Sequence, residues 1–193
     1  MTSLTNGKYR LSNNQKMEIA GNLVAAASSS ENLSEDALFF LHEWLVIGAE
    51  PLRAFIDTWN IVLNDYTPNH FPILFRAMDK RKRLNTGRIC SYTGSFEVAD
   101  RFMRSKIVVL DTAKVMEGYT PEAMEEERKF MLEIKEKHGI EYEVENIPIF
   151  SFYPLTEVLS QHDVCTSWIH EDEYVVREPH SATSVWCRQR QLS

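Results

Sequence analysis

Hydrophobic positions in the first third of the chain recur with the spacing of amphipathic helices. The segment from Gln15 to Ala27 is rich in strong helix formers, and Ser34 is a good N-cap for a helix that Gly48 ends. A third helix is predicted from Pro51 to about Leu63, where apolar residues return every three or four positions. The aromatic residues of this third segment are expected in a core: Phe55 and Trp59.

After Pro68 the pattern changes, because short β-like runs alternate with loops and helices. Helices are predicted at 96–103 and at 121–138, where the charges of the second helix form a solvated face with i,i+4 pairs. Strands are predicted at 73–75, 107–110, 147–153, 174–176 and 184–187.

The order of these elements predicts an α+β protein, with N-terminal helices followed by a mostly antiparallel sheet. A chain of 193 residues suits one domain, with a helical part at 1–66 and a core at 70–193. The hydrophobic fraction of 44% and charged fraction of 25% are ordinary for globular proteins.

Composition also bears on location. No apolar stretch approaches the ~20 residues that span a bilayer, and the N-terminus has no apolar signal region. The odd number of widely spaced cysteines favours reduced thiols over a disulfide framework: Cys90, Cys165 and Cys187. We therefore expect a cytoplasmic protein with no membrane partner.

The net charge of −7 argues against a surface that grips nucleic acid over its whole extent. One local basic run occurs at 79–83, DKRKR. It is either a solvated loop or a set of contacts to phosphates or to an acidic partner.

Common nucleotide and hydrolase motifs are missing. The chain contains neither GxGxxG nor GxxxxGK[ST], and HExxH and GxSxG are absent as well. His162, Cys165 and His170 lie near one another in sequence, but their spacing matches no zinc signature, so no metal is predicted.

Three polar features occur in a definite order. Arg76 follows the apolar run 71–75, Ser91-Tyr92-Thr93 follows a short loop, and Glu171-Asp172-Glu173 precedes the β-like run 174–176. This order resembles the arginine, serine and glutamate (R-S-E) pattern of the mono-ADP-ribosyltransferases, which include bacterial and phage-encoded effectors. The resemblance covers about 74–176 and implies an ADP-ribosyltransferase-like split sheet.

Spacing supports the resemblance. The family's serine motif is commonly followed by a short helix with the pattern E-V-A-x-x-F, which here is Glu97 to Phe102. Two positions depart from the family, because Ala77 replaces the usual glycine after the arginine and Thr93 replaces a serine. Two further E-x-E triplets lie within 141–145, but the one at 171–173 directly precedes a strand.

The resemblance implies NAD as a substrate and assigns roles at the site. Glu173 takes the position of the family's catalytic glutamate, and Glu171 takes the one that accompanies transfer to arginine. Because side chains alternate along a strand, the two carboxylates are expected on the same side of an extended segment. The residues expected to bind NAD are Arg76, Ala77, Ser91, Tyr92, Thr93 and Glu173, of which Arg76 and Ser91 are also assigned to catalysis.

The expected partner is a host or target protein, possibly associated with nucleic acid, met in the cytoplasm of a host cell if the enzyme is phage-encoded. Trp168 is either a contact to that target or an ordinary packed side chain. Two alternatives keep the fold but change the acceptor to water or to nucleic acid. A third is a non-catalytic inhibitor or adaptor whose N-terminal helices bind a partner through Trp44, Phe55 and Trp59.

Overall fold

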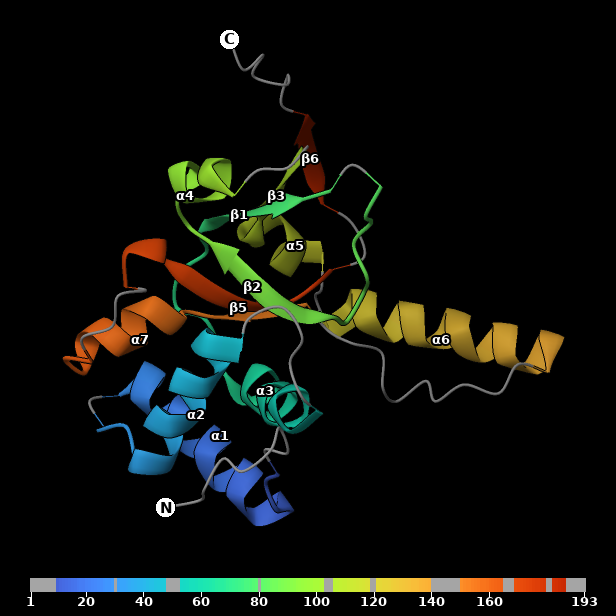
Figure 1. Cartoon of the computed structure of the whole chain (residues 1–193). Helices are drawn as coiled ribbons and strands as arrows, with labels where there is room; N and C mark the ends of the chain where they lie inside the picture. The colour runs from blue at the N-terminus through green and yellow to red at the C-terminus, as the bar shows by residue number, and fades with distance from the viewer. Residues whose placement is uncertain are drawn as a thin grey trace, which may run out of the picture. The chain divides into compact units, whose positions relative to one another are not determined.

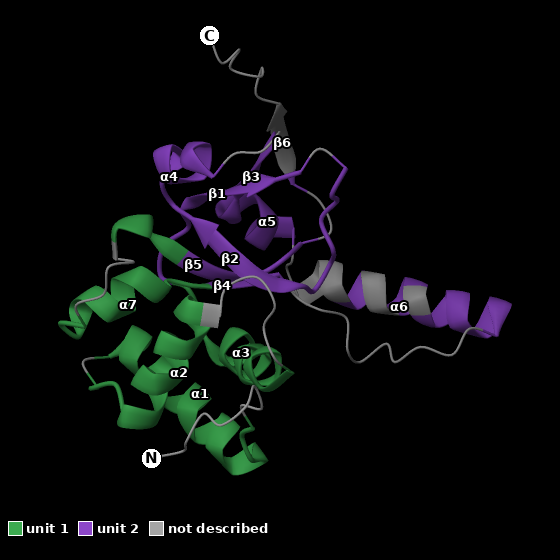
Figure 2. Cartoon of the chain, in the orientation of Figure 1, with its two compact units in different colours: residues 1–68, 153–173 green, residues 69–152, 174–193 purple. Residues whose placement is uncertain are grey.

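The computed structural model describes residues 10–29, 31–47, 53–79, 81–102, 106–118, 121–139, 150–164, 169–179 and 182–186. The chain divides into two compact units (Figure 2): unit 1 comprises 1–68 and 153–173, and unit 2 comprises 69–152 and 174–193. The first division follows Pro68, close to the predicted end of the helical part. Segment 153–173, which the sequence assigned to the core with the sheet, groups with the helices of unit 1.

Unit 1 is helical (Figure 1) and contains α1 (Asn13–Ser28), α2 (Glu35–Ile47), α3 (Arg53–Asp65), α7 (Leu155–Gln161) and the 3₁₀ turn η2 (Ile169–Glu171). The N-cap expected at Ser34 is confirmed, because its hydroxyl accepts a hydrogen bond from the Ala37 N–H at 3.2 Å. Helix α1 lies beside α3, and Lys16 Nζ reaches Asp57 Oδ2 at 2.7 Å.

Aromatic side chains fill the core of unit 1. Trp59 is fully buried, with ring centroids 5.4 Å from Phe40 and 5.4 Å from Tyr153. The Tyr153 hydroxyl donates a hydrogen bond to the Leu23 carbonyl at 2.7 Å. Residue 153 and helix α7 therefore belong with the helices because they complete this apolar core.

The aromatic side chains that an adaptor would use to bind a partner are buried in unit 1. Trp44, Phe55 and Trp59 are 5%, 0% and 0% exposed. An adaptor that binds a partner through these three side chains would have to open its own core, so the structure does not support that route.

Unit 2 contains most of the sheet, with strands β1 (Ile73–Met78), β2 (Ile89–Thr93), β3 (Lys106–Asp111), β4 (Ser151–Tyr153), β5 (Glu173–Arg177) and β6 (Thr183–Trp186). Their order in the sheet is β4-β5-β2-β1-β3-β6. The pairs β1–β2, β1–β3 and β3–β6 are antiparallel. The α+β class and the antiparallel sheet are confirmed. Helices α4 (Phe96–Arg101), α5 (Thr112–Gly118) and α6 (Pro121–His138) complete the unit.

The pairing along the sheet is uneven. Strands β1 and β3 are paired at six positions from Ile73↔Asp111 to Met78↔Lys106. Strands β1 and β2 are paired only at Phe75↔Thr93. Strands β1 and β2 are thus joined at a single register position, and Arg76 is the first β1 residue past this pair.

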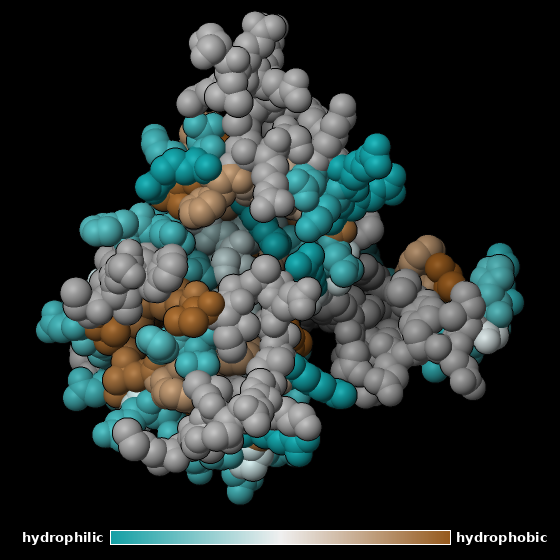
Figure 3. All heavy atoms as spheres, in the orientation of Figure 1, coloured by the Kyte–Doolittle hydropathy of each residue, from teal (hydrophilic) through white to brown (hydrophobic). Residues whose placement is uncertain are grey.

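Apolar side chains from several strands make up the core of unit 2: Leu74, Met78, Cys90, Tyr92, Val108, Leu110, Phe150, Phe152, Tyr174 and Val176. Figure 3 shows hydrophobic atoms at the surface over α4, where Phe96 and Phe102 are 42% and 60% exposed. In the part of the chain that is described, no helix is both long and apolar enough to cross a membrane.

Replacing Tyr153 with Phe tests the hydrogen bond inside unit 1. Because the change removes only the hydroxyl that binds the Leu23 carbonyl, we expect the free energy of unfolding to fall by about 1 kcal/mol. Urea denaturation measures it. Tyr66→Phe is the matched control, since the Tyr66 hydroxyl makes no hydrogen bond to a described residue, and an equal loss there would contradict this interpretation.

Candidate functional site

Arg76 lies on β1, one residue past the position where this strand pairs with β2. Leu74 and Met78, two positions before and after Arg76 on β1, enter the core of unit 2. The Arg76 side chain shares that inward direction but is polar, so it needs a partner inside the unit. Its exposed fraction is 21%.

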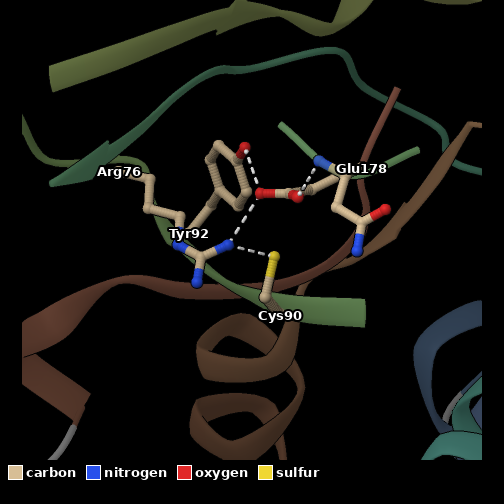
Figure 4. Close-up of polar contacts among 5 residues, drawn as sticks. Arg76, Cys90, Tyr92 and Glu178 are labelled. Carbon is tan, nitrogen blue, oxygen red and sulfur yellow. Dashed lines mark hydrogen bonds and ion pairs between the residues drawn. The ribbon is translucent and has the colours of Figure 1, made fainter. Parts of the chain in front are cut away.

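The partner is Glu178, which directly follows β5 (Figure 4). Arg76 Nη1 lies 2.7 Å from Glu178 Oε1, and the Tyr92 hydroxyl donates to the same oxygen at 3.2 Å. The second oxygen, Oε2, accepts the backbone N–H of Asn85 at 3.0 Å. The Glu178 side chain is 1% exposed. A buried carboxylate is thus compensated by one cation and two further donors.

The backbone around Glu178 strengthens this junction. Gly87 N–H donates to the Glu178 carbonyl at 2.9 Å, and the Glu178 N–H donates to the Arg88 carbonyl at 2.8 Å. Gly87 has a φ of 78°, a conformation that favours glycine. Glu178 therefore ties the β1–β2 loop and the start of β2 to the end of β5.

The ionisation states in this cluster follow from burial. Burial raises the pKa of the Cys90 thiol and of the Tyr92 hydroxyl, so both stay protonated near neutral pH. Burial lowers the pKa of Arg76, but the neighbouring acidic groups of Cys90, Glu178 and Tyr92 raise it by more, so the net pKa is raised. Arg76 Nη1 also contacts Cys90 Sγ, and its Cζ lies 5.6 Å from the centre of the Tyr92 ring.

The serine motif ends β2 as expected, but its three residues differ in accessibility. Ser91 is exposed, whereas Tyr92 and Thr93 are 2% and 8% exposed. Thr93 Oγ1 accepts the Ser95 N–H at 3.0 Å, and the Ser95 hydroxyl caps α4. Among the three, Ser91 is the one whose side chain can reach a ligand, while Thr93 shapes the turn into α4.

The prediction that Glu171 and Glu173 lie on the same side of an extended segment is wrong. Glu171 ends the 3₁₀ turn η2, Asp172 has a φ of 44°, and Glu173 begins β5. A left-handed residue between two glutamates breaks the alternation of an extended strand, so Glu171 and Glu173 do not share one side of a strand. Aspartate tolerates this conformation better than most residues because its short side chain can hydrogen-bond locally.

The two glutamates consequently have different surroundings in unit 1. Glu173 is 9% exposed, Trp44 Nε1 donates to its Oε1 at 3.3 Å, and its backbone N–H donates to Thr156 Oγ1 at 2.7 Å. Glu171 is half-buried. One carboxylate is held inside the unit and the other is accessible at its surface.

The structure brings Arg76 and Tyr92 together in unit 2, and Ala77 pairs with Ile107 in the β1–β3 ladder. Glu171 and Glu173 belong to unit 1 and are described there. Trp168, Cys165 and the triplets at 141–145 lie outside the described residues. Within the described ranges, no group of three or more His, Cys, Asp or Glu side chains could hold a metal ion.

Sequence reasoning missed Glu178 as the partner of Arg76. The available signal was an acidic residue two positions after the apolar run 174–176, where a strand continues to bury its side chains. The basic run follows β1, and its residues Arg81, Lys82 and Arg83 are exposed.

Comparison of the chain with protein-family models, curated proteins and solved structures finds no significant match.

A double-mutant cycle tests the ion pair. Because removal of one partner leaves a buried charge uncompensated, we expect Glu178→Gln to lower the free energy of unfolding by about 3 kcal/mol. Arg76→Met combined with Glu178→Gln should cost less than the sum of the single changes. Denaturant unfolding measures all four proteins.

The exposed pair of Lys114 and Asp111, 3.4 Å apart in the same unit, is the control. Its cycle should give a coupling of about 0.5 kcal/mol or less. Additive losses at Arg76 and Glu178 would show that the two side chains do not stabilise each other.

Proposed function

We propose that this chain is an NAD-dependent mono-ADP-ribosyltransferase that transfers ADP-ribose to a side chain of a protein, arginine being the favoured acceptor. The observation that carries the proposal is where the pattern residues fall in the fold. Arg76 is on β1, Ser91 is near the end of β2, and Glu173 begins β5. These three strands are neighbours in the order β5-β2-β1. Ser91 and Glu173, 82 positions apart in sequence (173 − 91), thus belong to adjacent strands, in keeping with the R-S-E pattern.

The side chains of unit 2 suit the nucleotide part of NAD. Both hydrogen bonds of the Arg76 guanidinium to described residues use Nη1, so Glu178 fixes its orientation while other N–H groups of the planar fork would meet phosphate or ribose oxygens. The exposed Ser91 hydroxyl would bind the ribose. Ala77 keeps the backbone groups that would meet the nicotinamide amide and adds one methyl group.

Glu173 would stabilise the reacting ribose. The bond between ribose C1′ and the nicotinamide nitrogen breaks, the electron pair leaves with neutral nicotinamide, and positive charge develops on the sugar as in glycoside hydrolysis. A preorganised carboxylate that accepts a hydrogen bond from the ribose 2′-hydroxyl and faces this positive charge lowers the activation barrier for cleavage. Glu173 is fixed at both its backbone N–H and its side chain, which suits such a role.

Glu171 would act on the acceptor. An arginine nitrogen forms the new bond to C1′, and the proton that it loses passes to a carboxylate. Glu171 is more exposed than Glu173, as a group that meets an incoming protein side chain must be. The kink at Asp172 separates the two environments and therefore supports two separate roles.

Two other acceptors fit the same half-reaction. Water would make the chain an NAD glycohydrolase, and the exposed basic run after β1 favours a phosphate-bearing acceptor such as nucleic acid. Incubation of the purified protein with labelled NAD and a bacterial lysate distinguishes them: label in protein supports the proposal, label in nucleic acid or free ADP-ribose alone supports an alternative, and no nicotinamide release contradicts all three.

Glu173→Gln should remove activity without unfolding the protein. The amide keeps the shape and an acceptor oxygen for Trp44 but loses the negative charge, so we expect nicotinamide release to fall by about 10²–10³. Glu157→Gln is the control, because it makes the same change at an exposed position of unit 1. Wild-type rates in Glu173→Gln would mean that Glu173 is not the catalytic glutamate.

Glu171→Gln should separate the two half-reactions. Cleavage of NAD by water needs less orientation than attack by a guanidinium, so nicotinamide release should continue while labelling of protein falls by at least about tenfold. Parallel assays of released nicotinamide and bound label measure both. Equal losses would assign Glu171 to NAD or to the fold, and undiminished labelling would exclude a role with arginine.

A further inference from the structure

Glu173 is held by a helix that carries no part of the R-S-E pattern. Trp44 lies on α2, 129 residues before Glu173, and its Nε1 donates to Glu173 Oε1 at 3.3 Å. The other anchor, Thr156 Oγ1 on α7, accepts the Glu173 backbone N–H at 2.7 Å. Both the main chain and the side chain of Glu173 are therefore fixed within unit 1.

The indole of Trp44 is itself held rigidly. It is 5% exposed, and its ring centroid lies 5.6 Å from that of Trp59 in an edge arrangement and 6.2 Å from that of Phe55. An indole nitrogen can donate a hydrogen bond but cannot accept one. A donor locked in an aromatic core can therefore hold an acceptor oxygen in one position.

A donor of this kind changes what the carboxylate can do. A carboxylate that is 9% exposed loses most of its hydration, and a hydrogen bond from a neutral N–H compensates the charge without cancelling it. The hydrogen bond from Trp44 also restricts the rotamer of the Glu173 side chain. Preorganised groups need this support from the residues behind them.

We propose that Trp44 is a positioning residue for Glu173, so that α2 of the N-terminal helical part is a component of the active site. The inference rests on the proposed function, since it concerns the orientation of the glutamate assigned to NAD cleavage. It gives the N-terminal helices a role in the reaction in addition to their role in the fold. Trp44 touches neither substrate, and it acts only through the carboxylate.

The chain offers a matched pair of variants. Trp44→Phe and Trp59→Phe each remove an indole from the same aromatic cluster, but Trp59 Nε1 is buried and has no hydrogen-bond partner in the described structure. Only Trp44→Phe removes a hydrogen bond to Glu173. We expect kcat for nicotinamide release to fall about tenfold in Trp44→Phe, the rate equivalent of one hydrogen bond to a charged group.

The Michaelis constant separates positioning from general damage. The KM for NAD should change by less than about twofold in Trp44→Phe, because an interaction that matters in the transition state lowers kcat at nearly constant KM. Trp59→Phe should keep a kcat within about twofold of wild type although it disturbs the same core. Equal losses of kcat in the two variants would overturn the positioning role.

A spectroscopic measurement covers the case in which Trp44→Phe does not fold. In ¹H–¹⁵N spectra of the full chain, Glu173→Ala should move the indole N–H signal of Trp44 upfield, because its acceptor is lost, and leave that of Trp59 in place. An unmoved Trp44 signal would overturn the inference. A wild-type protein that releases no nicotinamide would instead overturn the proposed function, so the two failures are distinguishable.

Discussion

The ion pair between Arg76 and Glu178 is the interaction on which the centre of the sheet depends. Strands β1 and β2 share one residue pair, at Phe75 and Thr93, so few backbone hydrogen bonds join them. Beside this pair, Glu178 binds Arg76 on β1, Tyr92 on β2 and the loop that connects these strands at Asn85. Side-chain bonds thus add to the limited backbone pairing of the two strands.

The buried cluster around Glu178 is stable only because both carboxylate oxygens have hydrogen-bond partners. A carboxylate that is 1% exposed would cost several kcal/mol if it lacked partners, and here it has a cation, a phenol and a backbone N–H. The same completeness restricts Arg76, whose guanidinium is held through Nη1 and by the ring of Tyr92. Arg76 can therefore pair with Glu178 and still contact a ligand, because the ion pair holds the remaining N–H groups of the planar guanidinium in a defined direction.

In unit 1, the carboxylate of Glu173 accepts a hydrogen bond from the neutral indole of Trp44, and the Glu173 backbone N–H donates to Thr156. An ion pair keeps a carboxylate in place but cancels its field, whereas a neutral donor keeps it in place and leaves the field. On this contrast we propose a structural role for Glu178 and a catalytic role for Glu173.

The order of the elements could be predicted from the sequence because it depends on local spacing. Helix α6 spans Pro121–His138 as predicted, and β1, β3, β5 and β6 lie within one to three residues of their expected positions. Periodicity, caps and strand-forming runs act over a few residues, so they do not need the fold to be known. Helices α5 and α7 were missed, because each has only seven residues and gives a weak periodic signal.

The geometry of the candidate site was decided by tertiary structure. The order of Arg76, Ser91 and Glu173 was visible in sequence, but the partner of Arg76 lies 102 residues away and that of Glu173 lies 129 residues away. The left-handed backbone of Asp172 likewise arises where η2 meets β5, whereas the E-x-E sequence alone predicts an extended chain. Sequence determined which residue types are available and on which elements they lie, whereas burial and long-range hydrogen bonds decided which partners surround each charged side chain.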